Sequence, residues 1–347
     1  MMPEEWPIAA SPANPTVPAQ AAGRGRLATV RADFFLDPAH RLSEQERALM
    51  SAMLHCLVGE VADAVRAALP PGWAGANDDS NLALIDSLSR SGLLDDPALM
   101  ALLVRRADEE RIGASGRARS GRREARTIQG LVSNDDGAVS AAAMALILAR
   151  GRRRDRFGQC LLLFDDLPPL LARSLADIIC AGLRVALAPV HGAGAVDSAL
   201  LAASASVLAG HDPARSVEAA TATLIAALDA GQLLEPLILA AAHEGELAFI
   251  AQAAATRAHL GGTAAIDELL SGDMRRVMTL LRMADLPRQQ SAGILAAIGD
   301  LLGIDDAARA IALFDRLTAG EVAEARAWLA LSPTYRAAVD TLDGPRG

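Results

Sequence analysis

Short amphipathic segments, each separated from the next by one or two turn residues, follow one another along most of the chain. The pattern is clearest from Gly231 to Gly303, where Ala- and Leu-rich stretches carry apolar residues at steps of three and four. Such spacing places the apolar residues on one face of a helix. Strand-like runs of β-branched and aromatic residues are scarce. We therefore predict an all-α protein.

Two dipeptides, Gly245-Glu246 and Gly272-Asp273, each open a new apolar segment, and they lie 27 residues apart. Glycine suits the left-handed position that ends one helix. The acid suits the positive N-terminal end of the next helix. Arrays of helical repeats use this arrangement, because a single helix pair cannot bury its apolar face alone. The pattern predicts an array of antiparallel helix pairs.

Start and stop signals define further helices. Ser43 and Glu46 have capping-box spacing, and Pro70-Pro71-Gly72 ends the apolar stripe that follows them. Asp95-Asp96-Pro97 is a second start signal. The other predicted segments are a helix from Asn81 to Arg90, an Ala-rich helix from Gly137 to Arg150, helix again from Phe157, a loop from Pro189 to Gly194, and successive helices to Leu342. About fifteen helices are expected.

The chain divides into three regions by composition. Residues 1–26 are rich in Pro, Ala and Gly without periodicity, which predicts a disordered leader. Residues 27–156 form an N-terminal helical region with an Arg-rich segment, and its first part, Leu27 to Ala39, is a short apolar anchor. Residues 157–347 form the C-terminal helical array.

Composition restricts the chemistry. Hydrophobic residues make up 52% of the 347 residues and aromatic residues only 3%, so Ala, Leu, Ile and Val must fill the core. All 33 basic residues are arginine. A P-loop needs a lysine on the phosphates, and Schiff-base chemistry needs a lysine amine. Walker-type nucleotide hydrolysis, pyridoxal-phosphate chemistry and kinase chemistry with a strand lysine are excluded.

Charge and cysteine content suggest a compartment. The net charge of −9 favours solubility and disfavours broad binding to nucleic acid. Cys56, Cys160 and Cys180 lie in apolar helical patterns without CxxC spacing, so we expect three small core residues in a reducing compartment. The N-terminus lacks the features of a signal peptide. The most apolar stretch, Val185 to Gly210, is interrupted before it reaches the ~18 residues of a membrane span. We expect a cytoplasmic protein with no membrane span.

One stretch is similar to a known family. The run LLEPLILAAAHEGELAFIAQAAATRAHLGG, the segment GDMRRVMTLLRMADLP, and FFLDPAHRLSEQERALMSAMLHCLV near the N-terminus resemble the bacterial, mainly alphaproteobacterial, domain of unknown function 2336. The ending LRMADLP, from Leu281 to Pro287, fits the family pattern, whereas Glu246 stands where an aspartate is expected. The resemblance covers most of residues 30–330. It implies a HEAT-like all-α protein, an α-solenoid-like array, and it transfers no catalytic residue.

Candidate catalytic and metal-binding groups favour structural roles. Adjacent helix residues such as His55 and Cys56 point about 100° apart. His243-Glu244-Gly245-Glu246 with His259 lacks the H-E-x-x-H spacing of a zinc site. Gly192-Ala193-Gly194 lacks the strand and third glycine of a dinucleotide site. The acidic pairs precede helices, where capping carboxylates belong; they are Asp78-Asp79, Asp95-Asp96, Asp135-Asp136, Asp165-Asp166 and Asp305-Asp306. We predict no catalytic residue, no metal site and no cofactor.

Two arginine clusters remain as candidate partner-binding residues. They are Arg105, Arg106, Arg117, Arg119, Arg122, Arg123 and Arg126 in the first cluster, and Arg152, Arg153 and Arg154 in the second. Charge runs usually form solvated faces, and acidic neighbours partly neutralise the first cluster. The functional alternative is that the first cluster forms a flexible arm, which binds phosphates or an acidic partner through bidentate contacts. The absence of interleaved aromatic residues argues against single-stranded nucleic acid.

The sequence as a whole favours a non-enzymatic scaffold that binds another protein. The alternative is a protein that binds nucleic acid or phosphate through the arginine clusters. An enzyme ranks third, and a deep pocket with convergent titratable groups would favour it. The partner and the oligomeric state do not follow from the sequence.

Overall fold

A computed structural model describes residues 42–73, 78–120 and 126–343. The chain divides into residues 1–44 and residues 45–347, and nearly all described residues belong to the second unit. The described residues form 16 α-helices and several short 3-10 helices, without a β-strand. The predicted all-α class is therefore confirmed. The predicted leader and the apolar anchor, as well as Arg122 and Arg123, lie outside the described residues.

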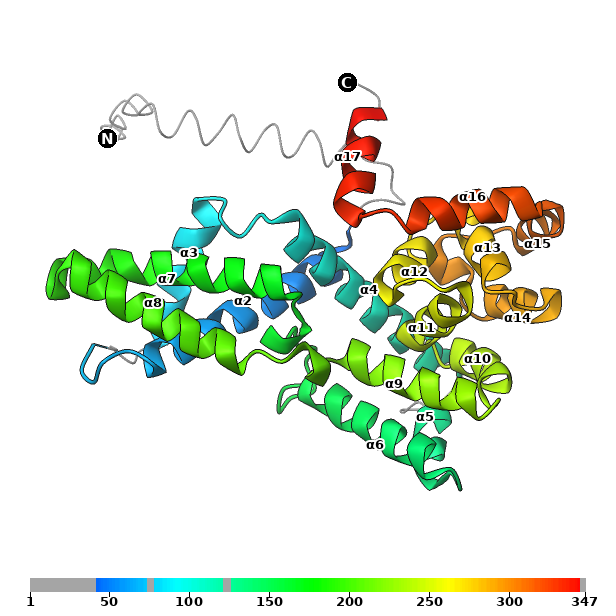
Figure 1. Ribbon diagram of the computed structural model, residues 1–347, viewed down its shortest axis with the longest axis horizontal. Coiled ribbons are helices and arrows are strands. Elements are labelled where there is room, and N and C mark those ends of the chain that lie inside the picture. The colour runs from blue at the N-terminus through cyan, green and yellow to red at the C-terminus, as the bar shows by residue number, and fades with distance from the viewer. Residues whose placement is uncertain (1–41, 74–77, 121–125, 344–347) are drawn as a thin grey trace, which may run out of the picture. The chain divides into compact units, whose positions relative to one another are not determined.

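The helices are labelled in Figure 1. The first eight are α2 (Glu44–Ala67), α3 (Asp78–Arg90), α4 (Pro97–Ser120), α5 (Arg126–Gly130), α6 (Gly137–Arg152), α7 (Pro169–His191), α8 (Ala193–Gly210) and α9 (Val217–Ala230). The others are α10 (Leu234–His243), α11 (Leu247–Ala258), α12 (Gly262–Leu269), α13 (Met274–Met283), α14 (Arg288–Ile298), α15 (Ala307–Arg316), α16 (Ala319–Leu329) and α17 (Pro333–Asp343).

Aspartates begin several helices, as the sequence predicts. The Asp96 carboxylate accepts hydrogen bonds from two N–H groups in the first turn of α4. Asp136 does the same for α6, Asp273 for α13 and Asp306 for α15. A cap of this kind contributes about 1 kcal/mol of helix stability. The second aspartate of three predicted pairs is therefore a cap.

The two Gly-acid dipeptides are alike at the glycine and differ at the acid. Gly245 and Gly272 have φ angles of 71° and 67°, so both adopt the predicted left-handed conformation. Asp273 caps α13 with its side chain. Glu246 holds the N-cap position of α11 without capping it, because its carboxylate pairs with Arg150.

Helices α7 and α8 form an antiparallel hairpin against which α3 packs (Figure 1). Gly182 on α7 lies where a Cβ atom would be 2.4 Å from the Leu84 side chain of α3, so the two helices approach closely. Among the described residues, the buried side chains of α2, α3, α7 and α8 lie outside the large apolar core formed by the remaining helices.

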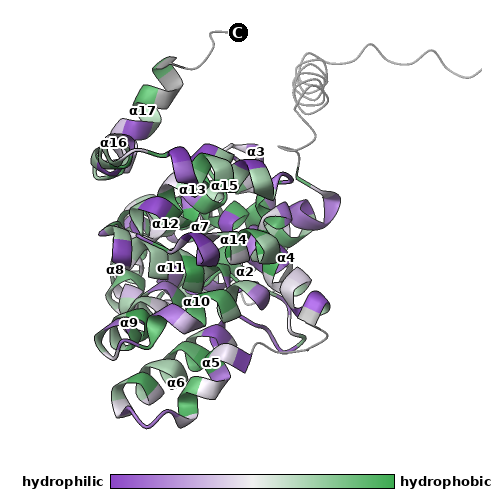
Figure 2. Cartoon of the chain, turned by 90° about the vertical axis from the view of Figure 1, so that its right-hand side faces the viewer, coloured by the Kyte–Doolittle hydropathy of each residue, from purple (hydrophilic) through white to green (hydrophobic). Residues whose placement is uncertain are grey.

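That large core joins Ile112 of α4 with buried residues of α5, α6 and α9 to α16. Helix α6 packs along α9, and contacts continue from α9 to α11, from α11 to α12 and from α12 to α13. Hydrophobic and hydrophilic residues are mixed along each helix, as amphipathic packing requires (Figure 2). The core takes residues from both sides of the boundary expected after residue 156.

Three segments differ from the sequence predictions. Residues 111–120 continue α4 to Ser120 instead of forming a flexible arm. The chain is not helical from Phe157, because an isolated bridge between Arg154 and Cys160 and a turn hold residues 153–163 until α7 begins at Pro169. The loop expected from Pro189 to Gly194 is reduced to Gly192, whose φ of 84° separates α7 from α8.

The cysteines divide into two kinds. Cys160 and Cys180 are buried, as predicted, and burial raises the pKa of both thiols, that of Cys180 to about 11. Cys56 is exposed on α2, so its prediction as a core residue is wrong. Met53 and Leu57, before and after Cys56 on α2, are both buried. The buried face of the helix contains these two residues and leaves Cys56 on the solvent side.

Two of the described helices are long and apolar enough to cross a membrane by length and composition alone. They are α2 and α8. A smaller share of α8 than of α2 is buried within the fold. Buried core helices of soluble proteins are often equally long and apolar. α8 fits that description less well than α2, because more of its apolar surface is exposed.

Candidate functional site: a charge network between two cavities

One face of α4 carries the residues around which the site is built. Arg106, Glu109, Glu110, Gly113 and Arg117 recur at steps of three and four, so their side chains lie along one side of the helix. The absence of a side chain at Gly116, one turn after Gly113, leaves room for the turn between α10 and α11. α4 thereby presents two arginines and two glutamates to the helices that pack beside it.

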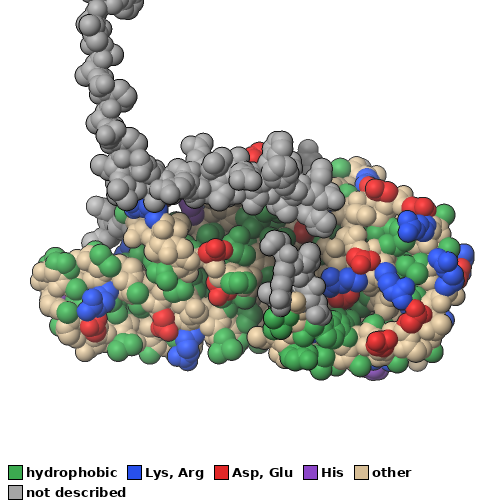
Figure 3. All heavy atoms as spheres, turned by 90° about the horizontal axis from the view of Figure 1, so that it is seen from above, with side chains coloured by type: hydrophobic (Ala, Val, Ile, Leu, Met, Phe, Trp, Pro, Cys, Tyr) green, Lys and Arg blue, Asp and Glu red, His purple; other side chains and the backbone are tan. Residues whose placement is uncertain are grey.

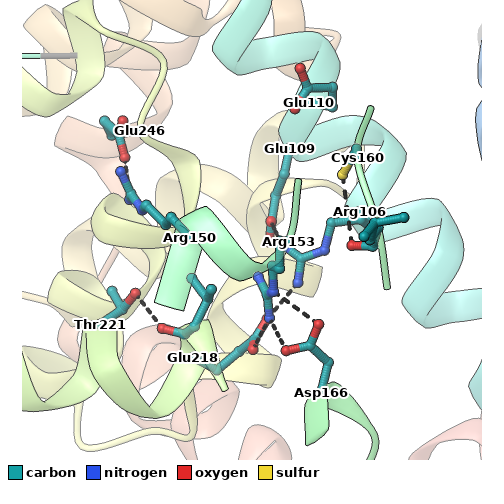
Figure 4. Close-up of polar contacts among 12 residues, drawn as sticks. Arg106, Glu109, Glu110, Arg150, Arg153, Cys160, Asp166, Glu218, Thr221 and Glu246 are labelled. Carbon is teal, nitrogen blue, oxygen red and sulfur yellow. Dashed lines mark hydrogen bonds and ion pairs between the residues drawn. The ribbon is translucent and has the colours of Figure 1, made fainter. Parts of the chain in front are cut away.

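Glu218, in the first turn of α9, connects Arg106 of α4 with Arg153 (Figure 4). Together with their other partners, Glu109 and Asp166, these residues form the charge network. Arg106 donates to Glu218 at 2.8 Å, and Arg153 donates to the second oxygen of the same carboxylate. Arg153 also makes a bidentate pair with Asp166, at 2.9 and 2.7 Å. The side chains of that pair are 6% and 1% exposed. A buried bidentate pair fixes the chain after α6 against the short helix at Phe164–Asp166.

Glu109 and Glu218 both pair with Arg106, but their pKa values move in opposite directions. Desolvation raises the pKa of Glu109 and outweighs the attraction of Arg106. Desolvation also acts on Glu218, but Arg153 and Arg106 outweigh it and lower its pKa to about 2. The Glu218 side chain is 52% exposed, so solvent screens part of this attraction. Both carboxylates are hydrogen-bonded to arginine, which makes them anchors for guanidinium groups.

A cavity of about 160 Å³, which we call the arginine cavity, opens beside this network. Five arginines and three glutamates line it: Arg106, Arg117, Arg150, Arg153 and Arg154, and Glu109, Glu110 and Glu246. The first turn of α11, with Leu247 and Ala248, completes the wall. Side chains from α4, α6 and α11 and from the segment after α6 therefore converge on one small space.

A second cavity of about 690 Å³ shares Arg106 and Glu109 with the arginine cavity. Its other walls come from α4, α9, α11 and α12, largely through small apolar residues such as Ala101, Ala222 and Ala251. Its volume lies within the range of small-molecule sites. The network therefore separates a small polar cavity from a larger and more apolar one.

Most of the predicted partner-binding arginines are used inside the fold. Arg105 pairs with Asp267, Arg106 with Glu109 and Glu218, Arg117 with Glu110, Arg119 with Asp300, Arg153 with Asp166 and Glu218, and Arg154 with Glu110, while Arg152 donates to the Arg215 carbonyl. Arg126 donates its backbone N–H to Glu244, and its side chain is exposed. The structure gathers Arg106, Arg117, Arg153 and Arg154 at the arginine cavity and places Arg105, Arg119, Arg126 and Arg152 elsewhere.

One sequence interpretation of acidic residues is wrong, and another is confirmed. Asp165 and Asp166 do not cap α7, because Asp165 pairs with Arg215 and Asp166 with Arg153. Glu244 has the structural role at a helix end that the sequence favours, since it is the C-cap residue of α10 and its carboxylate also accepts from the N–H groups of Arg126 and Thr127 at the start of α5. Among the described residues, no group of three His, Cys, Asp or Glu side chains is placed to hold a metal ion.

The sequence interpretation missed the carboxylates of the network. Arg106 and Glu109 carried a local signal, since oppositely charged residues three apart on a helix can pair. Glu218 carried none, because its partners Arg106 and Arg153 lie 112 and 65 residues away. Arg150 appears in the sequence only as the end of a predicted helix, but in the structure it pairs with Glu246, and both residues line the arginine cavity.

Comparison with known proteins gives one match. Residues 85–326 match the model of a family described as an uncharacterised protein conserved in bacteria, DUF2336. The match begins within α3 and ends within α16, so it includes the network, the arginine cavity and the lining of the second cavity except Pro333. A search of the curated proteins and of the solved structures finds no match.

Proposed function

We propose, from the premise that this chain belongs to the DUF2336 family, that it is a non-enzymatic scaffold that works by protein–protein association. The observation that carries the proposal is the exposed apolar surface of the α7–α8 hairpin. Leu170, Val185 and Val190 on α7 are 84%, 74% and 74% exposed, and Leu201 on α8 is 70% exposed. These large apolar side chains are exposed along the length of the hairpin, and exposed apolar surface of this kind is typical of an interaction site.

The remaining surface of α8 favours close contact with another helix. Its exposed positions are otherwise alanine, glycine and serine, for example Ala202, Ala205 and Ala209. On the face shown in Figure 3, charged groups are more widely spaced over the α7–α8 end, at the left, than over the end formed by α13 to α16. Burying the hairpin surface in an interface therefore costs less desolvation free energy than burying the more highly charged end.

The partner that this surface fits is a second copy of the chain. The hairpin carries two arginines, Arg173 and Arg184, and two aspartates, Asp177 and Asp197. Equal and opposite charges on one patch are self-complementary, which is the requirement of a two-fold symmetric interface. Arg184 and Asp197 already pair within one chain and are about half exposed, so the same pair is able to exchange between copies.

Three further features belong to the same proposal. The sequential contacts among α9 to α16 support a HEAT-like array, in which each helix pair leans on the next. The buried free thiols Cys160 and Cys180 support a reducing compartment such as the cytoplasm. The internal pairing of the arginines favours the scaffold over the nucleic-acid alternative, because a paired guanidinium must give up a carboxylate before it binds a phosphate.

The first prediction concerns Leu201→Glu. Wild-type protein is expected to sediment as a dimer of 36.0 kDa chains at concentrations of about 100 μM, within the range of weak homodimers. A charge at this exposed apolar position of the hairpin is expected to weaken the dimer at least ~tenfold. Analytical ultracentrifugation over a concentration series measures the dissociation constant, and circular dichroism checks that the variant keeps its helices.

Leu148→Glu is the matched control, because Leu148 is also an exposed leucine, 64% exposed, but lies on α6. It is expected to leave the dimer unchanged. A wild-type monomer at every concentration, or an equal effect of both variants, contradicts the proposal. A monomer that binds lipid vesicles through Leu201 would assign the hairpin to a membrane surface instead.

A further inference from the structure

We propose that the arginine cavity binds a small oxyanion of the phosphate class. The site is distinct from the α7–α8 surface, and the inference does not rest on the scaffold proposal. Three sets of hydrogen-bond donors meet at this cavity: the first turn of α11, the buried Arg106 side chain, and the two partly exposed guanidinium groups of Arg150 and Arg154.

The N-terminus of α11 supplies the first set of donors. The residues from Gly245 to Ala248 line the cavity, and α11 is 12 residues long. No side chain caps its first turn, because the carboxylate of Glu246 is drawn to Arg150. The contrast with Asp273, which caps α13 after an equivalent glycine, shows that the chain is able to cap this kind of start. An uncapped helix N-terminus presents backbone N–H groups and positive potential to an anion.

Arg106 supplies the second set. Its side chain lines the cavity, the residue is only 6% exposed, and its Nε has no hydrogen-bond partner among the described residues. Its terminal nitrogens bind Glu109 and Glu218, which fixes the guanidinium plane. A buried N–H group without an acceptor costs about 1–3 kcal/mol. A ligand oxygen in the cavity would remove this cost.

Arg150 and Arg154 supply the third set. Arg150 uses one terminal nitrogen on Glu246, and Arg154 uses its two terminal nitrogens on Gly158 and Glu110. A guanidinium has five N–H donors. The two side chains are 29% and 39% exposed, so they are able to reorient toward a ligand without unfolding the site.

Charge and volume define the ligand class. The lining carries five arginines and three glutamates, and Asp166 and Glu218 neutralise Arg106 and Arg153 from behind. The anion is therefore held by unsatisfied donors and the helix end, with no large excess of positive charge, and its affinity is expected to be moderate. A volume of about 160 Å³ admits one phosphate-sized group with a few waters and excludes a nucleic-acid strand. This favours a free phosphate or a phosphoryl group on a small molecule.

Isothermal titration calorimetry of the full chain with inorganic phosphate, at constant ionic strength set by sodium chloride, tests the proposal. One saturable site is expected, with a dissociation constant on the order of 0.1 mM. A second arm with glycerol phosphate distinguishes the source: binding of both ligands assigns a phosphoryl group, and binding of inorganic phosphate alone assigns the free ion. An acetate arm measures the discrimination against carboxylates.

Two variants establish the location. Arg150→Gln removes one guanidinium, and Ala248→Asp places a carboxylate in the first turn of α11, where its negative charge interacts with the helix end and repels the anion. Each is expected to weaken phosphate binding at least ~tenfold. Arg152→Gln is the control, because Arg152 is a neighbouring arginine that does not line the cavity. No saturable binding by wild type, or equal binding by wild type and Ala248→Asp, overturns the proposal.

Discussion

Gly116 and Gly245 allow α4 to lie directly against the turn between α10 and α11. A Cβ atom on Gly116 would lie 2.5 Å from the backbone of Glu244. One on Gly245 would lie 2.5 Å from the Ile112 carbonyl oxygen, and Gly245 also has positive φ. The contact is made by backbone on both sides, so neither partner has a flexible side chain that could move away.

Gly116→Ala is therefore expected to destabilise the protein by about 1–3 kcal/mol, the usual cost of overpacking. Gly151→Ala is the matched control, because Gly151 lies inside α6 with no atom within 4 Å of its virtual Cβ. That change is expected to be neutral or to stabilise by up to ~1 kcal/mol through helix propensity. Urea denaturation of both variants measures the difference, and equal stabilities would show that the helices move apart at little cost.

Local signals explain which parts of the site were predictable at the residue scale. Asp96 and Asp136 act on N–H groups two and three residues away, so the sequence contains the whole interaction. Arg106 and Glu218 act across 112 residues, and only the packing of α4 against α9 brings them together. The caps could therefore be predicted from the sequence, and Arg106 and Arg153 could be predicted as candidate binding residues. Their carboxylate partner Glu218 could not, because the sequence does not show which distant residues pack together.

Helix α4 shows why the arginine-rich segment was mistaken for a flexible arm. Residues 111–120 contain glycine, serine and three arginines and few apolar residues, which is typical of a solvated loop. The helix persists because long-range contacts replace the missing apolar face: Arg111 pairs with Glu46, and Arg119 with Asp300. The Arg119 guanidinium also donates to the Ala297 carbonyl at the end of α14.

Ala114→Pro tests whether this part of the chain is helical in solution. Ala114 is exposed, so the change removes no buried contact. Proline inside a helix costs about 3 kcal/mol, through a lost hydrogen bond and a clash with the preceding turn. Ala114→Ser, a small exposed replacement at the same position, is expected to cost less than ~1 kcal/mol. Thermal unfolding followed by circular dichroism compares the two, and an unchanged midpoint for Ala114→Pro would restore the flexible arm.

At the scale of the whole molecule, Glu218 links folding to acidity. Its folded-state pKa of about 2 lies below the ordinary 4.5, so the ionised form stabilises the fold above pH 4.5. This contribution is lost as the pH falls toward the folded-state value. Because half of the side chain is exposed, solvent screening limits the contribution to about 1 kcal/mol.

The free energy of unfolding of wild type is therefore expected to exceed that of Glu218→Gln near neutral pH, and the gap is expected to narrow below pH 4.5. Denaturant titrations at a series of pH values measure both proteins. Glu235→Gln, at an exposed position on α10, controls for the loss of one negative charge. A gap that stays constant or widens on acidification contradicts the assigned role of Glu218.

Helix α4 is synthesised before the carboxylates with which its arginines pair. The partners of Arg106, Arg105 and Arg119 lie 112, 162 and 181 residues later in the chain. At about 5–20 residues per second, a ribosome makes the Arg119 side chain on the order of ten seconds or more before it makes Asp300. A cationic helix therefore leaves the exit tunnel before the carboxylates that neutralise it, and during that interval the nascent chain depends on water and counter-ions to keep α4 soluble.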